Sequence, residues 1–150
     1  MRNISEASVL EDLVGRLRRL GPTQPRVWGT MNAQQMAQHV GDAFAAVLKQ
    51  RAFSSKPRSG PTGLRRIAVL YLIPRMPRGI KSGAEPASFV VEPATFAGDV
   101  DRAVTLLRQL ATAPAGSLMD RHPILGPMTR GDWMRYAFLH TDHHLRQFGL

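Results

Sequence analysis

Four long segments of this 150-residue chain place their apolar residues at intervals of three and four, and this spacing constrains the fold more than any other feature. Such intervals gather side chains on one face of an α-helix. The predicted helices cover residues 4–20, 33–49, 96–111 and 130–148. Because each apolar face must be buried against another, the sequence predicts an all-α four-helix bundle.

Residues that begin and end helices flank these segments. Three pairs have the spacing of a capping box, in which two residues satisfy each other's free main-chain N–H groups. They are Asn3 with Glu6, Asn32 with Gln35, and Thr129 with Asp132. Gly149 is placed to end the last helix.

A long irregular basic excursion separates the second and third helices. Residues 63–73 predict a shorter apolar helix that Pro74 and Pro77 bring to an end. Residues 50–62 and 74–95 are rich in Pro, Gly and Ser and predict loops, with a short strand considered at 89–91. No repeat or second domain is evident, so residues 1–150 are expected to form a single domain.

The positive charge is concentrated in this excursion. The formal net charge is +9, and no acidic residue lies between Asp42 and Glu85. Nine basic residues occupy that interval: Lys49, Arg51, Lys56, Arg58, Arg65, Arg66, Arg75, Arg78 and Lys81. They are either a solvated loop or an anion-binding surface. One hypothesis is therefore a non-enzymatic module whose Arg-rich segment 49–81 binds nucleic acid or another anionic partner.

Composition excludes other classes of site. The chain has no cysteine, which rules out disulfides and thiolate ligands within it. Its longest apolar run, residues 67–73, is far shorter than the ~20 residues of a membrane span. The first residues lack the apolar run of a signal peptide. We expect a cytoplasmic protein that does not enter the membrane.

Three of the five histidines lie close together near the end of the chain. His140 and His144 are four residues apart, so one helix projects both imidazoles from the same face. His39 lies on the inward stripe of the second predicted helix. The three predict a site for Zn, Ni, Fe or Mn with an open coordination position. The alternative is that they are hydrogen-bonded core residues, in a structural dimer formed through residues 67–73.

Other polar residues are candidates for the surroundings of this site. His143 is expected at its rim or behind the ligands, and Asp142 or Asp42 to orient an imidazole. Arg146, like Arg65 and Arg66, is available to an anionic group of a substrate. His122 is expected to be a structural loop residue, and Trp28 and Trp133 to serve in packing.

Two stretches carry a resemblance to a known superfamily. One is residues 28–39, which begin Trp28-Gly29-Thr30-Met31 and end at His39; the other comprises residues 122–126, 132–133 and 140–149. With the helix pattern, they resemble the DinB/YfiT-like superfamily of metal-dependent bundle proteins. Within it, the chain looks most like a bacterial branch that ends in His-His-Leu-Arg-Gln-Phe-Gly.

The resemblance implies a metal ion held by one His of the second helix and an H-x-x-x-H of the last. These positions correspond to His39, His140 and His144. Relatives include thiol-dependent transferases and hydrolase-like enzymes, commonly dimers. The resemblance therefore implies a metal-dependent hydrolase or thiol-dependent transferase that acts on a small molecule as a homodimer, with a low-molecular-weight thiol as a candidate second cofactor.

Overall fold

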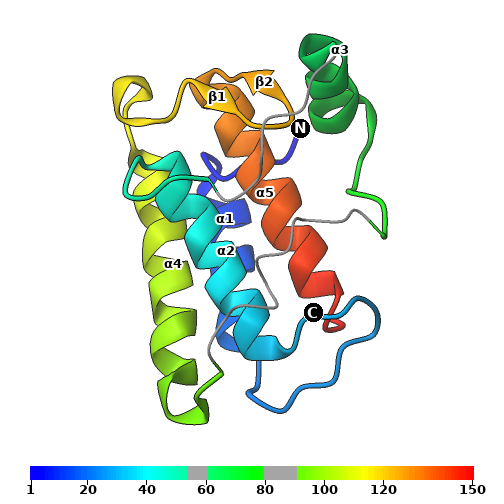
Figure 1. The fold of residues 1–150 in the computed structure, drawn as a ribbon, viewed down its shortest axis with the longest axis vertical. Helices are drawn as coiled ribbons and strands as arrows, with labels where there is room; N and C mark the ends of the chain where they lie inside the picture. Colours follow the sequence, from blue (N-terminus) through cyan, green and yellow to red (C-terminus); the bar gives the residue numbers. More distant parts are fainter. Residues whose placement is uncertain (54–60, 80–90) are drawn as a thin grey trace.

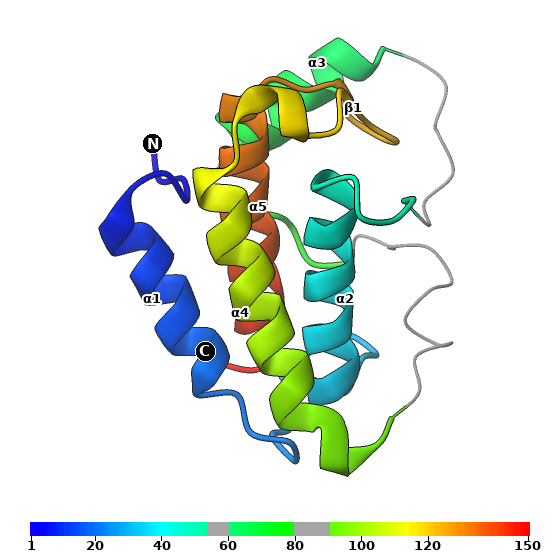
Figure 2. The ribbon, with the colours of Figure 1, turned by 90° about the vertical axis from the view of Figure 1, so that its left-hand side faces the viewer.

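Four helices of 12 to 17 residues lie side by side in the computed structural model, which describes residues 1–53, 61–79 and 91–150 (Figure 1). They are α1 (Ala7–Arg18), α2 (Ala33–Val47), α4 (Phe96–Thr112) and α5 (Arg130–Arg146). Figure 2 shows α1, α4 and α2 arranged around α5. The prediction of an all-α fold is confirmed.

Shorter elements connect the long helices. The predicted helix over residues 63–73 is α3 (Thr62–Ile67) continued by a π-helical turn, η1 (Ala68–Leu72). Single turns of 3₁₀ helix form η3 (Pro93–Thr95), where a loop was predicted, and η4 (Ala115–Ser117). An unpredicted antiparallel hairpin pairs β1 (Arg121–His122) with β2 (Gly126–Pro127). The strand considered at 89–91 lies mostly outside the described residues.

Two of the three predicted capping boxes are confirmed, at Asn32 with Gln35 and at Thr129 with Asp132. The third forms only in part: Glu6 Oε1 accepts from the Asn3 N–H at 3.2 Å, but Asn3 Oδ1 accepts from Ser5 at 2.8 Å, and α1 begins only at Ala7. Ile4 is buried, and its N–H donates to the Met134 carbonyl at 3.3 Å, which holds this part of the chain against α5.

The centre of the molecule is α5, whose residues from Asp132 to Leu145 are all buried. α1, α2, α4 and η1 all contact it. Trp133 is completely buried, and its Nε1 donates to the Met119 carbonyl at 2.6 Å. Any side chain that α5 directs toward α2 therefore lies in the interior.

Close packing against α4 fixes the position of α2. A Cβ added to Gly41 would lie 2.9 Å from Arg102 Nη1 and 3.7 Å from Ala103 Cα. At the start of both helices, Gln34 Nε2 donates to Thr95 Oγ1 at 2.9 Å and to Asp99 Oδ2 at 2.8 Å. His39 thus projects from a helix that α4 holds in place.

In the described part of the basic excursion, several arginine side chains bind other groups of the protein. Arg65 Nη1 donates to the Ile124 carbonyl at 3.0 Å, and Arg66 donates to the Pro127 carbonyl. Arg51 forms an ion pair with Asp42. Two of the three arginines that the sequence offers for an anionic substrate, Arg65 and Arg66, therefore hold the hairpin. Lys56, Arg58 and Lys81 lie outside the described residues.

Exposed apolar side chains gather on α3 and η1, namely Leu64, Ile67, Tyr71 and Leu72. Contact of residues 67–73 with a second copy stays a prediction. Within the described parts of the chain, no helix combines the length and apolar character needed to cross a membrane.

His122 has a structural role, as expected, although it lies in β1 rather than in a loop. Its Nδ1 accepts hydrogen bonds from the N–H groups of Ile124 at 3.0 Å and Leu125 at 3.2 Å. Nδ1 must therefore be unprotonated, and burial lowers the pKa of this imidazole to about 4.

We predict that His122→Asn destabilises the protein more at pH 7.5 than at pH 5. The pKa of His122 is lower in the folded state than the 6.5 of an unperturbed imidazole, so its contribution to stability is complete above pH 6.5 and is lost as the pH falls toward 4. The difference between the two pH values should be about 2 kcal/mol in the free energy of unfolding. Urea denaturation measures it, and Asn retains an acceptor for the two N–H groups. Equal destabilisation at both pH values would contradict the prediction.

Candidate metal centre

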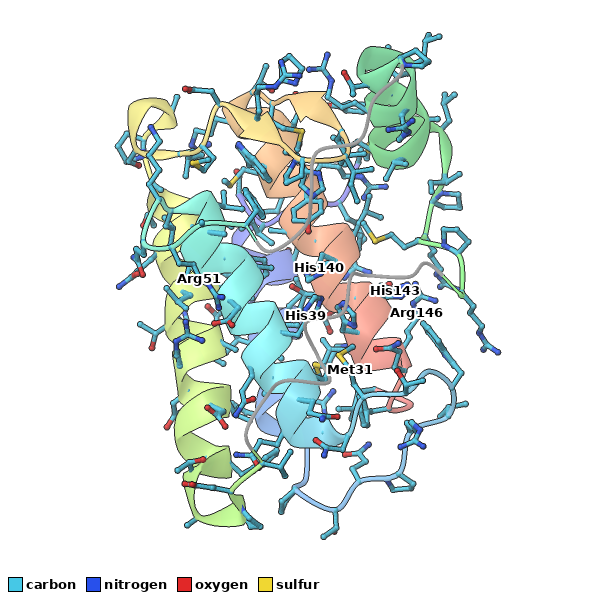
Figure 3. All side chains as sticks on the ribbon, viewed as in Figure 1. Met31, His39, Arg51, His140, His143 and Arg146 are labelled. Atoms are coloured by element: carbon cyan, nitrogen blue, oxygen red, sulfur yellow. The ribbon has the colours of Figure 1, made fainter. Side chains whose placement is uncertain are left out.

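Three imidazoles meet in the interior between α2 and α5. His140 Nε2 lies 3.2 Å from His39 Nε2 and 3.2 Å from His144 Nε2. One ligand atom from each of the three lies within 4.8 Å of the others, and all three side chains are buried. Figure 3 shows His39 of α2 and His140 of α5 near each other between the two helices. The structure therefore brings together the three histidines that the sequence selects.

The helix geometry explains this convergence. His140 and His144 are separated by one turn of α5, so their rings project from the same face. His39 is buried on α2 among Met36, Val40 and other residues of its inward stripe. Because α4 fixes α2 and the surrounding helices fix α5, two rigid elements hold the three rings.

Gln147 orients the ring of His144. The Nδ1 of His144 and the Oε1 of Gln147 are 2.7 Å apart. An amide oxygen can only accept, so Nδ1 carries the proton and the Nε2 lone pair is directed to the other two imidazoles. The sequence did not lead us to predict a role for Gln147, although its interval of three from His144 indicates a neighbour one turn away.

An aromatic shell surrounds His140. The ring of Tyr136 stacks on it with centroids 5.2 Å apart, and the ring of Phe44 meets it edge-on at 6.2 Å. Burial, together with neighbouring imidazoles, lowers the pKa of His140 and of His144 well below 6.5. Both rings are therefore neutral at pH 7, which is the form that binds metal ions.

The donor set fits a divalent transition metal. For Zn–N bonds of 2.0–2.1 Å in a tetrahedron, two ligand nitrogens lie about 3.3 Å apart. The two Nε2–Nε2 distances of 3.2 Å agree with this spacing. The group contains three imidazoles and, among the described residues, no carboxylate. The buried Nδ1 of His140 has no hydrogen-bond partner among the described residues.

The other residues expected near the site fall into two places. His143 lies beside it, with its ring centroid 5.1 Å from that of His144 and its Nδ1 3.3 Å from the Met76 carbonyl oxygen. Asp142 and Arg146 instead bind each other, with Arg146 Nε donating to Asp142 Oδ2 at 2.8 Å. Asp142 also pairs with Arg16 at 3.0 Å. Its carboxylate therefore binds two arginines, and it is Gln147 that orients an imidazole.

The outer side of the site carries an aromatic ring and a cation. Trp28, half-buried, meets the ring of His143 edge-on at 4.8 Å. The guanidinium carbon of Arg78 lies 5.4 Å from the centre of the Trp28 ring. Trp28 thus packs on His143, whereas Trp133 packs in the core. Asp42, the other carboxylate considered as a partner of an imidazole, forms ion pairs with Arg51 and Arg102.

Comparison with known proteins identifies one family. The family model described as the DinB superfamily matches residues 7–148, which is nearly the whole chain. Searches of the curated proteins and of the solved structures gave no match. The matched region includes all three histidines of the site.

We predict that Gln147→Ala weakens binding of Zn²⁺ by about 10–100-fold, because His144 loses the acceptor that fixes its tautomer and orientation. Competition with a chromogenic chelator at pH 7.5 measures the dissociation constant. Gln109→Ala on the exposed surface of α4 is the matched control and should leave affinity unchanged.

Gly29→Ala tests the same contact from the other side. Gly29 has a φ of +89°, and a Cβ there would lie 2.7 Å from Gln147 Nε2. The substitution should displace the amide and weaken Zn²⁺ binding in the same direction as Gln147→Ala. Wild-type affinity in both folded variants would show that Gln147 does not support the site.

Proposed function

The chain belongs to the DinB superfamily, and on this premise we propose that it holds one divalent transition-metal ion through His39, His140 and His144 and transfers a low-molecular-weight thiol to a small electrophilic substrate. The observation that carries the proposal is the donor set, which is three buried imidazoles without a carboxylate among the described residues.

Neutral ligands leave the full positive charge of the ion in place. A divalent ion held in this way supplies Lewis acidity, which lowers the pKa of a thiol or water in the open position. A thiol has an ordinary pKa near 8.5, far below that of water. It therefore needs less activation, and no separate general base is required to form the nucleophile. This difference favours thiol transfer over hydrolysis.

The protein's own residues prepare the site for this chemistry. Gln147 holds the His144 ring in its ligand tautomer, and Phe44 and Tyr136 exclude water from the side of His140. In the transfer, the thiol sulfur bonds to the electrophilic carbon of the substrate. The leaving group departs with its electron pair, and the thiol proton passes to solvent.

Hydrolysis by an activated water is the second candidate. Its supporting observation is His143, which lies beside His144 and outside the ligand set. An imidazole at this place is suited to accept a proton from water near the open position.

Metal content tests the binding part of the proposal. Tag-free protein should carry close to one equivalent of a transition metal by mass spectrometry, directly or after incubation with Zn, Ni, Mn or Fe. His144→Ala should lose it, because two imidazoles remain. His122→Asn removes a histidine outside the cluster and should retain it. A folded wild-type protein that binds none of the four metals would refute the proposal.

Activity separates the two candidates. Metal-loaded protein is incubated with a panel of low-molecular-weight thiols and 1-chloro-2,4-dinitrobenzene, and separately with nitrophenyl esters without a thiol. We expect conjugation to exceed that of His144→Ala at least tenfold, with little ester cleavage. Ester cleavage alone would support hydrolysis in place of thiol transfer. If the wild type catalyses neither reaction faster than His144→Ala does, the result counts against both candidates.

A further inference from the structure

A cavity of about 460 Å³ lies on the side of α5 away from the histidines. Its wall includes the first two residues, the segment from Tyr71 to Arg75, and α5. Phe138 and Asp142 line it, and each is two residues from His140, or about 200° around the helix. In Figure 1 the green segment after α3 runs on the side of α5 opposite α2. The helix itself thus separates the cavity from the metal centre.

Arg135 is a buried cation in this wall, with 6% of its surface exposed. Its Nε donates to the Leu70 carbonyl at 2.9 Å and its Nη1 to the Arg2 carbonyl at 2.8 Å. Carbonyl groups satisfy these N–H donors, and the Asp142 carboxylate acts on the guanidinium through space without forming an ion pair with it. Among the described residues no carboxylate forms an ion pair with Arg135, although buried charges in proteins are ordinarily paired.

The rest of the wall adds positive charge. Arg2 and Arg75 both line the cavity. Arg2 pairs with Asp12 at 3.3 Å, whereas Arg75 is exposed with no hydrogen bond or ion pair within the described ranges. Among the described residues, Asp142 supplies the one carboxylate in the wall. It already binds Arg16 at 3.0 Å and Arg146 at 2.8 Å. The cavity therefore has an excess of cations.

Apolar surface lies next to these cations. The guanidinium carbons of Arg2 and Arg135 lie 5.0 Å and 5.3 Å from the centre of the Phe138 ring. Leu72, Ile73 and Pro74 continue the wall. A ligand that fits must combine a negative charge with an apolar body.

We propose that this cavity binds a small organic carboxylate with an apolar body, whose carboxylate is the counter-ion of Arg135. The planar fork of a guanidinium matches the two oxygens of a carboxylate, and the hydrogen bonds between them are charge-assisted. Only two N–H groups of Arg135 are used on the main-chain carbonyls, and three of its five remain for a ligand. Phe138 and the segment from Leu72 to Pro74 contact the apolar body.

Calorimetric titration with octanoate tests the proposal on the intact protein. Octanoate should bind at one site, and octan-1-ol, which has the same chain without the charge, about 10–100-fold more weakly. Inorganic phosphate, which lacks the apolar body, should also bind at least tenfold more weakly. Absence of octanoate binding, equal binding of octanol, or equal binding of phosphate would overturn the proposal.

Variants locate the site. Arg135→Met should weaken octanoate binding by about 10–100-fold, and Arg75→Ala at the rim by about two- to fivefold. Arg121→Ala, an exposed arginine of β1 outside the cavity wall, is the control and should bind as the wild type does. Thermal denaturation checks folding. If Arg135→Met does not fold, unchanged binding by Arg75→Ala overturns the proposal and weaker binding supports it.

Because carboxylates also bind metal ions, a further titration must distinguish octanoate bound in this cavity from octanoate bound at the metal centre. Octanoate is titrated into folded His144→Ala protein. Retained affinity supports a site on the opposite side of α5. Loss of affinity would assign octanoate to the histidine site and overturn this proposal, without affecting the proposed metal function.

Discussion

The burial of α5 on all sides is the constraint on which the rest of the structure depends. A helix buried all round is ordinarily apolar all round, yet this one carries Arg135, Asp142 and three histidines among its buried residues. Each polar group must then find a partner inside the protein. Arg16 of α1 and Arg146 pair with Asp142, while the Leu70 and Arg2 carbonyls accept from Arg135. α5 thus positions its neighbours through polar contacts as much as through packing.

The two faces of α5 meet this constraint differently because their side chains differ in acidity. An imidazole can respond to burial by remaining neutral, and burial lowers the pKa of His140 and His144 accordingly. Neutrality leaves a lone pair on each ring that can bind a metal ion. A guanidinium stays charged at any ordinary pH, so Arg135 on the other face must retain its charge in the interior. The same burial therefore produces a ligand set for a cation on one side and a site suited to an anion on the other.

The sequence was sufficient for features that depend on local spacing. The interval of four between His140 and His144, the stripe that contains His39 and the capping boxes at Asn32 and Thr129 all follow from helix geometry. The sequence was not sufficient to predict contacts where several partners were available to one residue. Asp142 could orient an imidazole or pair with arginines, and only the approach of α1 brings Arg16 to it. Glu6 had the spacing of a capping box with Asn3, but Asn3 Oδ1 accepts from the Ser5 N–H instead, and α1 begins at Ala7.

The end of the chain shows how closely the metal centre depends on its surroundings. After His144, Leu145 is completely buried, Arg146 binds Asp142, and Gln147 Oε1 accepts from His144 Nδ1. The Gln147 carbonyl also accepts from Val27 N–H at 2.6 Å, and the Phe148 carbonyl accepts from Gln24 at 2.6 Å. The chain next to Trp28 is thereby bound to Gln147, the residue that orients the His144 ring. Because one glutamine contacts both, movement of the segment around Trp28 at the outer side of the site would be transmitted to the His144 ring.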